Sequence, residues 1–189
     1  MNHLRVLIAG IGNIFLGDDA FGVKVAQRLR RETLPDGVAV VDFGIRGLDL
    51  TYALLDEAYE SVILVDAVPR GGAPGTLYVI EPGEADLDDP APSDPGEVLI
   101  DTHNMDPAKV LRLVGAMGGN LRRIVLVGCE PQPCDSYEEM AGGLSAPVSN
   151  ALNEAVDLVL SLAAEMLRAV PEQRASLSSV STEPERNAP

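Results

Sequence analysis

The sequence predicts an α/β fold, a three-layer α/β/α sandwich with a mostly parallel central sheet. Short apolar runs that are typical of strands alternate along the chain with segments whose apolar residues recur at helical spacing. The runs are apolar at consecutive positions, which indicates strands that are buried on both faces. Strands that alternate with helices form βαβ units, and such units build a parallel sheet that helices cover on both sides.

The first expected strand, residues 5–9, ends at Gly10, and a helix with apolar residues from Phe21 to Leu29 follows it. Asp18 stands where the N-cap of this helix would be. We expect further strands at residues 38–41, 61–65, 76–80 (paired antiparallel) and 123–127, and further helices at 48–57, at 106–116 and from Pro147 onward.

Length and composition suit one globular domain. With 189 residues, of which 46% are hydrophobic, we expect a single domain at residues 1–168 and a disordered tail at 169–189. The net charge of -15 repels phosphate and anionic lipid, which argues against nucleic-acid and membrane partners. No apolar run reaches the ~18 residues of a membrane span, and the N-terminal residues lack the regions of a signal peptide, so we expect a cytoplasmic protein.

A glycine-rich segment, Gly10–Gly22, follows the first strand. A dinucleotide-binding loop would need a third glycine where this chain has Phe15, and a helix start that accepts phosphate. Asp18 and Asp19 occupy that helix start and would repel phosphate, so a nucleotide site is not expected. A cation site is consistent with these carboxylates. The simpler alternatives are that Asp18 caps the helix and that Asp19 complements the helix dipole.

Residues at strand ends and before a later helix are further candidates for a site. Asp66 directly follows the apolar run 61–65, and ligands of open α/β sheets bind beyond the carboxyl ends of the strands. Its alternative role is to form the turn before the next Pro-Gly-Gly segment. Asp42 ends the second strand in the same way and is the weaker candidate. Of the two histidines, His3 lies at the N-terminus and His103 precedes a helix. Two carboxylates and one imidazole suit a divalent metal with open coordination positions.

Nucleophilic catalysis has weaker support in the sequence. Cys129 follows a strand and could be a nucleophile with His103 as its base, but we expect a buried and unreactive cysteine. The chain contains no G-x-S-x-G segment, so a serine hydrolase of that type is not supported.

Taken together, these residues resemble the hydrogenase maturation protease family, which processes the large subunit of nickel-iron hydrogenases. The resemblance extends from Arg5 to about Leu167. Its most specific part is the opening G-x-G-N-x-x-x-G-D-D-x-x-G, and the order of all the segments adds to the specificity. The segments are Gly10–Gly22, Asp42–Gly47, Val65–Ala67, His103 before a helix, Val127–Gly128 and Gly143–Pro147.

The resemblance implies a cytoplasmic endopeptidase, with its protease domain at residues 1–168, that removes a C-terminal peptide from the precursor of a nickel-iron hydrogenase large subunit. It also implies that Asp19, Asp66 and His103 are the catalytic residues and bind nickel that the precursor supplies. The family often has Glu at the first of these positions, so the Asp19 side chain is one methylene shorter. The water could be activated by the metal, by Asp18 or by Asp42.

Three other functions fit parts of this pattern. A nickel-binding accessory protein of hydrogenase assembly, without protease activity, would have the same three ligands. A nucleotide-binding oxidoreductase is disfavoured by Phe15 and by the Asp18-Asp19 pair. An unrelated interaction module would hold Asp19, Asp66 and His103 far apart.

Overall fold

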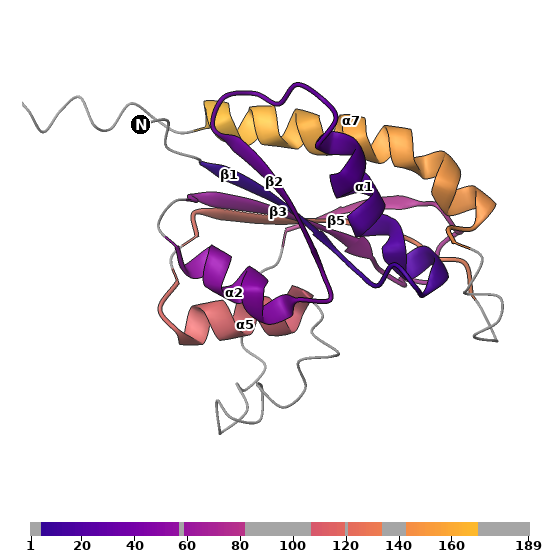
Figure 1. Cartoon of the computed structure of the whole chain (residues 1–189), viewed down its shortest axis with the longest axis horizontal. Coiled ribbons are helices and arrows are strands. Elements are labelled where there is room, and N and C mark those ends of the chain that lie inside the picture. Colours follow the sequence, from indigo (N-terminus) through magenta and orange to yellow (C-terminus); the bar gives the residue numbers. More distant parts are fainter. Residues whose placement is uncertain (1–4, 57–58, 82–106, 120, 134–142, 170–189) are drawn as a thin grey trace, which may run out of the picture.

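The computed structural model describes residues 5–56, 59–81, 107–119, 121–133 and 143–169 (Figure 1). This part of the chain contains a sheet of five strands in the order β2-β1-β3-β5-β4. The neighbours are parallel except that β4 runs antiparallel to β5, as the sequence predicted. The strands are β1 (Val6–Ile11), β2 (Val38–Gly44), β3 (Ser61–Ala67), β4 (Leu77–Ile80) and β5 (Arg123–Cys129).

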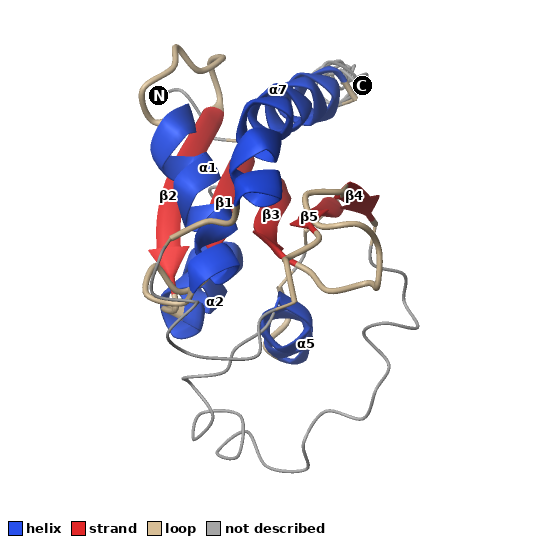
Figure 2. Ribbon diagram, turned by 90° about the vertical axis from the view of Figure 1, so that its right-hand side faces the viewer, coloured by secondary structure: helices blue, strands red, loops and turns tan. Residues whose placement is uncertain are grey.

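Helices cover both faces of the sheet, which confirms the predicted three-layer α/β/α sandwich. Figure 2 shows α7 and α5 on opposite sides of the strands. No helix in the described ranges is long and apolar enough to cross a membrane. The helices are the short 3-10 helix η1 (Gly17–Ala20), then α1 (Phe21–Leu29), α2 (Gly47–Leu55), α5 (Pro107–Ala116) and α7 (Ala146–Arg168).

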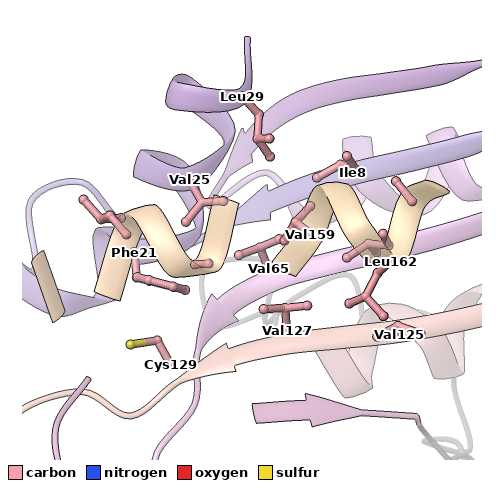
Figure 3. Close-up of a cluster of buried hydrophobic side chains, with 14 of the residues drawn as sticks. Ile8, Phe21, Val25, Leu29, Val65, Val125, Val127, Cys129, Val159 and Leu162 are labelled. Carbon is pink, nitrogen blue, oxygen red and sulfur yellow. The ribbon is translucent and has the colours of Figure 1, made fainter. Parts of the chain in front are cut away.

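Alternating side chains of each buried strand enter two separate cores, because successive strand residues point to opposite faces of the sheet. In β3, Ile63 and Val65 pack in one core with residues of α1 and α7. Val62 and Leu64 pack in the other core with residues of α2 and α5. Figure 3 shows the first core, where Val159 and Leu162 of α7 lie over the strands. Burial on both faces explains why the strands are apolar at consecutive positions.

The strand order changes direction at β1. From β1 the chain passes through α1 to β2 on one side, and then through α2 to β3 on the other side of β1. In doubly wound sheets such a change opens a crevice outside the carboxyl ends of the two central strands, and ligands bind there. At these ends lie Gly12, the first residue after β1, and Asp66 and Ala67, the last two residues of β3.

Candidate functional site

Two glycines let α1 begin directly against the backbone of the sheet. A Cβ atom on Gly22 would lie 1.9 Å from the carbonyl oxygen of Val65 and 2.5 Å from that of Ile11. A Cβ atom on Gly10 would lie 2.4 Å from the carbonyl oxygen of Gly22. All three distances are far below van der Waals contact, so no other residue fits at either position without a backbone shift. The outer glycines of the opening motif therefore set the distance between α1 and strands β1 and β3. We call this contact the glycine junction.

The middle glycine of the motif, Gly12, lies between the two candidate acidic residues. Its φ angle is +123°, and a Cβ atom on it would lie 1.7 Å from the backbone oxygen of Asp19 and 3.6 Å from Oδ1 of Asp66. The next residue, Asn13, donates its backbone N–H to Oδ2 of Asp19 over 2.7 Å. The structure thus brings Asp19 and Asp66 together around Gly12, although they are far apart in the sequence.

Asp66 is the more buried of the two carboxylates, with an exposed fraction of 8%. Its Oδ1 accepts a hydrogen bond from the backbone N–H of Ala67 at 2.8 Å. The residue paired with it on β5 is Gly128, which places no side chain beside it. This hydrogen bond compensates part of the cost of burying the carboxylate, and it fixes the orientation of the side chain at the carboxyl end of β3, where ligands of such sheets bind.

Asp18 does not cap the helix, contrary to the prediction from the sequence. It lies inside η1, and α1 begins only at Phe21. Its Oδ1 accepts the backbone N–H of Ser145 at 2.6 Å. Its Oδ2 accepts the Ser145 hydroxyl and the backbone N–H of Gln132, both at 2.8 Å. Asp18 therefore connects η1, which also carries Asp19, to the start of α7 and to the segment after β5. We call this set of bonds the Asp18 clamp.

Asp42, the weaker candidate, lies on the next strand of the sheet. Its Oδ2 accepts a hydrogen bond from the amide of Gln27 at 3.3 Å, and its backbone oxygen accepts one from Arg46 at 2.6 Å. The backbone N–H of Gly12 donates to the carbonyl oxygen of Gly44 over 3.1 Å, which connects the loop after β2 to the loop after β1. Asp42 is thus beside the site, on a neighbouring strand end.

Cys129 is fully buried in the core between the sheet and α7 (Figure 3). Burial, with smaller contributions from the charges of Asp18 and Glu130, raises the pKa of its thiol to about 12. A thiol with this pKa is protonated at neutral pH and is not a nucleophile. The prediction that Cys129 is a buried core residue is confirmed, and its raised pKa favours an unreactive thiol.

Glu130 is an organising residue that the sequence did not reveal. Its carboxylate is buried and accepts hydrogen bonds from the backbone N–H groups of Arg70 and Gly71 at 2.8 and 3.0 Å and from the Tyr78 hydroxyl at 2.8 Å. Burial raises the pKa of Glu130, but the hydrogen bonds from Tyr78 and from the backbone of residues 70–72 outweigh burial and hold the pKa below its ordinary value. Glu130 thereby fixes the loop that follows Asp66. The sequence shows an acidic residue after β5, but its partners lie 52 to 60 residues earlier in the chain, so no local pattern reveals its role.

His103, the third predicted ligand, lies outside the described residues. Within the described part of the chain, no group of three or more His, Cys, Asp or Glu side chains could hold a metal ion. Asp19 and Asp66 supply two carboxylates, which are suitable ligands for a divalent cation but need at least one further donor for a mixed imidazole and carboxylate site.

Comparison with known proteins identifies the family. The family model of the hydrogenase maturation protease matches residues 23–162. The hydrogenase expression/formation protein HupD of Bradyrhizobium diazoefficiens is 31% identical over 175 residues, which cover 92% of this chain and 85% of HupD. The related protein HupM of Azotobacter chroococcum is 34% identical over 162 residues, which cover 85% of this chain and 72% of HupM. The chain belongs to the hydrogenase maturation protease family.

Solved structures agree with this assignment. The hydrogenase maturating endopeptidase HybD from E. coli superposes with a TM-score of 0.66 at 27% identity, and the match covers 85% of this chain and 93% of HybD. The [NiFe] hydrogenase maturation protease HycI from Thermococcus kodakarensis gives a TM-score of 0.59 at 27% identity over 87% of this chain and 93% of HycI. This hydrogenase maturation protease is therefore an endopeptidase and a hydrolase. A non-proteolytic accessory protein and a nucleotide-binding oxidoreductase are not favoured.

Proposed function

We propose that this protease removes a C-terminal peptide from the nickel-loaded precursor of a nickel-iron hydrogenase large subunit, and that Asp19, Asp66 and His103 bind the nickel. The nickel belongs to the substrate. Cleavage then depends on prior nickel insertion, because the three ligands gain affinity for the precursor only when the metal is present.

The observation that carries this proposal is the position of the two carboxylates. Asp66 Oδ1 and the backbone of Asp19 both lie close to Gly12, at the carboxyl ends of β1 and β3. One oxygen of each carboxylate accepts a backbone hydrogen bond, from Asn13 in one case and Ala67 in the other. Such bonds fix the orientation of a metal ligand and are a regular feature of metal sites.

The donor set suits nickel. Carboxylate oxygen and imidazole nitrogen are both accepted by divalent first-row metals, and His103 would supply the imidazole. Bound in this way, the metal could polarise the scissile carbonyl or lower the pKa of a water molecule. Asp19 and Asp66 bind and orient the precursor so that its scissile bond lies at the crevice.

Asp18 is a poor choice for the general base, since both of its oxygens accept hydrogen bonds in the Asp18 clamp. Asp42 is the remaining carboxylate at this edge of the sheet that the sequence singled out. An Asp42→Asn variant with lost kcat and unchanged precursor affinity would assign Asp42 as the base. Unchanged kcat would leave water activation to the metal.

The decisive test is an intact-mass assay on the precursor from the same source, with and without nickel loaded. Wild-type protein should release a C-terminal peptide only from the nickel-loaded form. Asp66→Asn should slow this reaction by at least about 100-fold, because a ligand is lost. The exposed Asp36, in a turn before β2, provides the matched control, and Asp36→Asn should cleave normally. Cleavage of nickel-free precursor at the same rate would refute nickel recognition. Absence of cleavage of a verified nickel-loaded precursor would favour the accessory protein.

We further propose that residues 1–168 are the complete catalytic unit and that it acts in the cytoplasm. Residues 170–189 of the predicted tail, which was expected at 169–189, lie outside the described residues. A protein that ends at Arg168 should cleave the precursor with unchanged kcat and KM. Cell fractionation should recover the protease with cytoplasmic markers, and recovery in another compartment would refute the localisation.

A further inference from the structure

Three large apolar side chains are exposed on the loops beside the two carboxylates. Phe15 is 78% exposed, Ile14 is 50% exposed and Ile45 is 52% exposed. The other two phenylalanines of the chain, Phe21 and Phe43, have exposed fractions of 0% and 5%. Phe15 is thus the one phenylalanine that folding leaves in contact with water, and leaving it there has a cost that a binding role would explain.

The loops that carry these side chains meet at the carboxyl edge of the sheet. Ile14 and Phe15 follow β1, and Ile45 follows β2, its parallel neighbour. The backbone N–H of Gly12 donates to the carbonyl oxygen of Gly44 over 3.1 Å, so the two loops are joined at their base. Asn13 donates its backbone N–H to the Asp19 carboxylate, so the loop that carries Ile14 and Phe15 lies beside the candidate metal site.

Both loops are held in one conformation by hydrogen bonds. The side-chain oxygen of Asn13 accepts the backbone N–H of Phe15 at 3.0 Å, and the backbone oxygen of Asn13 accepts the N–H of Leu16 at 3.0 Å. On the other loop, the Arg46 guanidinium donates to the carbonyl oxygens of Phe43 and Asp42 at 3.1 and 2.6 Å. Exposed apolar groups on a preorganised backbone lose little conformational entropy when a partner binds.

We propose that Ile14, Phe15 and Ile45 form an apolar anchor that binds an apolar segment of the precursor polypeptide next to its metal. This inference rests on the proposed function and names a contact surface within it. The anchor lets the protease hold the precursor by contacts that do not depend on nickel. The anchor therefore sets the affinity for the polypeptide, whereas the carboxylates bind the metal.

The size of the anchor fits a protein substrate better than a second copy of the chain. Its three side chains expose roughly 350 Å² together, whereas a stable dimer buries about 800 Å² on each partner. An aromatic side chain at the centre of a small apolar patch is typical of a contact that carries much of the binding energy in a larger, transient interface.

The test replaces Phe15 with Ser and compares the variant with Met117→Ser. Met117 is 52% exposed, as Ile45 is, but it follows α5, which leads back to the amino end of β5 at the opposite edge of the sheet. Phe15→Ser should raise KM for the nickel-loaded precursor about 10-fold or more while kcat changes little, because a central aromatic contact is lost. Phe15→Leu should restore KM, and Met117→Ser should behave as wild type. All variants should melt at the wild-type temperature, since Phe15 is not packed in the core.

Direct binding separates failure of the anchor from failure of the proposed function. The dissociation constant for the precursor is measured by interferometry for wild type, Phe15→Ser and Met117→Ser. If wild type cleaves and Phe15→Ser has unchanged KM and affinity, the anchor is refuted and the protease function stands. If wild type binds the precursor without cleaving it, the function fails, and a loss of affinity of about 10-fold in Phe15→Ser still supports the anchor. Concentration-dependent dimers that Phe15→Ser abolishes, with precursor affinity unchanged, would assign the surface to a second copy and overturn the proposal.

Discussion

Replacing Asp18 with Ala should destabilise the fold, even though Asp18 belongs to neither core. Its carboxylate accepts three hydrogen bonds from Ser145 and Gln132, which are 127 and 114 residues further along the chain. Hydrogen bonds to a charged group contribute about 1.5–3 kcal/mol each when they are isolated from water. The bond to Gln132 is exposed and those to Ser145 are partly buried, so water will replace part of this energy. We expect a loss of about 2–3 kcal/mol in total.

For a chain of this size the loss corresponds to a fall in Tm of about 5–10 °C. Urea unfolding followed by circular dichroism would measure the free energy directly. The exposed Asp36 again provides the control, and Asp36→Ala should change the free energy of unfolding by less than about 0.5 kcal/mol.

A double-mutant cycle with Ser145→Ala tests whether the clamp itself is responsible. Ser145 occupies the N-cap position of α7, but its side chain makes no capping hydrogen bond. Its hydroxyl donates to Asp18 instead, so Ser145→Ala removes this bond without removing a cap. The two substitutions should therefore be coupled by about 0.5–2 kcal/mol. Additive effects, or an unchanged Tm in Asp18→Ala, would refute the clamp.

Three further predictions concern other contacts. Gly22→Ala should prevent folding, because its Cβ would lie 1.9 Å from a backbone oxygen. Gly115→Ala should instead stabilise α5 by up to about 1 kcal/mol, because no atom lies within 4 Å of its Cβ. Expression yield and Tm would test both substitutions. In a Cys134→Ser background, Cys129 should not react with Ellman's reagent at pH 8 until urea unfolds the protein, because burial raises its pKa to about 12. Hydrogen bonding lowers the pKa of Glu130 in the folded state. The Glu130 carboxylate therefore stabilises the fold above the unfolded-state pKa, and this stabilisation is lost as the pH falls through the folded-state pKa. The difference in Tm between wild type and Glu130→Gln should shrink from pH 7 to pH 3.

Much of the fold could be predicted because burial on both faces makes each central strand a continuous apolar run. The location of Asp66 at a strand end followed from the same reasoning. The antiparallel direction of β4 was also predicted, but its partner β5 was not. The short 3-10 helix before α1 could not be predicted, because the capping rules place Asp18 equally well at a helix start. That error led to the wrong role for Asp18.

The parts of the site that sequence reasoning missed depend on contacts between distant segments. Glu130 acquires its role from the backbone N–H groups of a loop before β4, and nothing local distinguishes it from a surface acid. Gly22 has its role because the start of α1 touches the carbonyl oxygens of two strands. In the sequence it was one position of a motif, and only the packed structure explains why that position needs glycine.

The glycine junction affects how far the core sequence can change without moving α1 relative to the sheet. At this junction the helix and the sheet touch through backbone atoms, so no side-chain substitution can change the size of the contact. Substitutions in the surrounding core therefore cannot easily shift the helix along the strands. The spacing of the carboxylates beside Gly12 should therefore tolerate considerable sequence drift elsewhere. An engineer could exchange apolar residues such as Val159 and Leu162 for thermal resistance, keeping total volume, and leave the spacing of the two carboxylates intact.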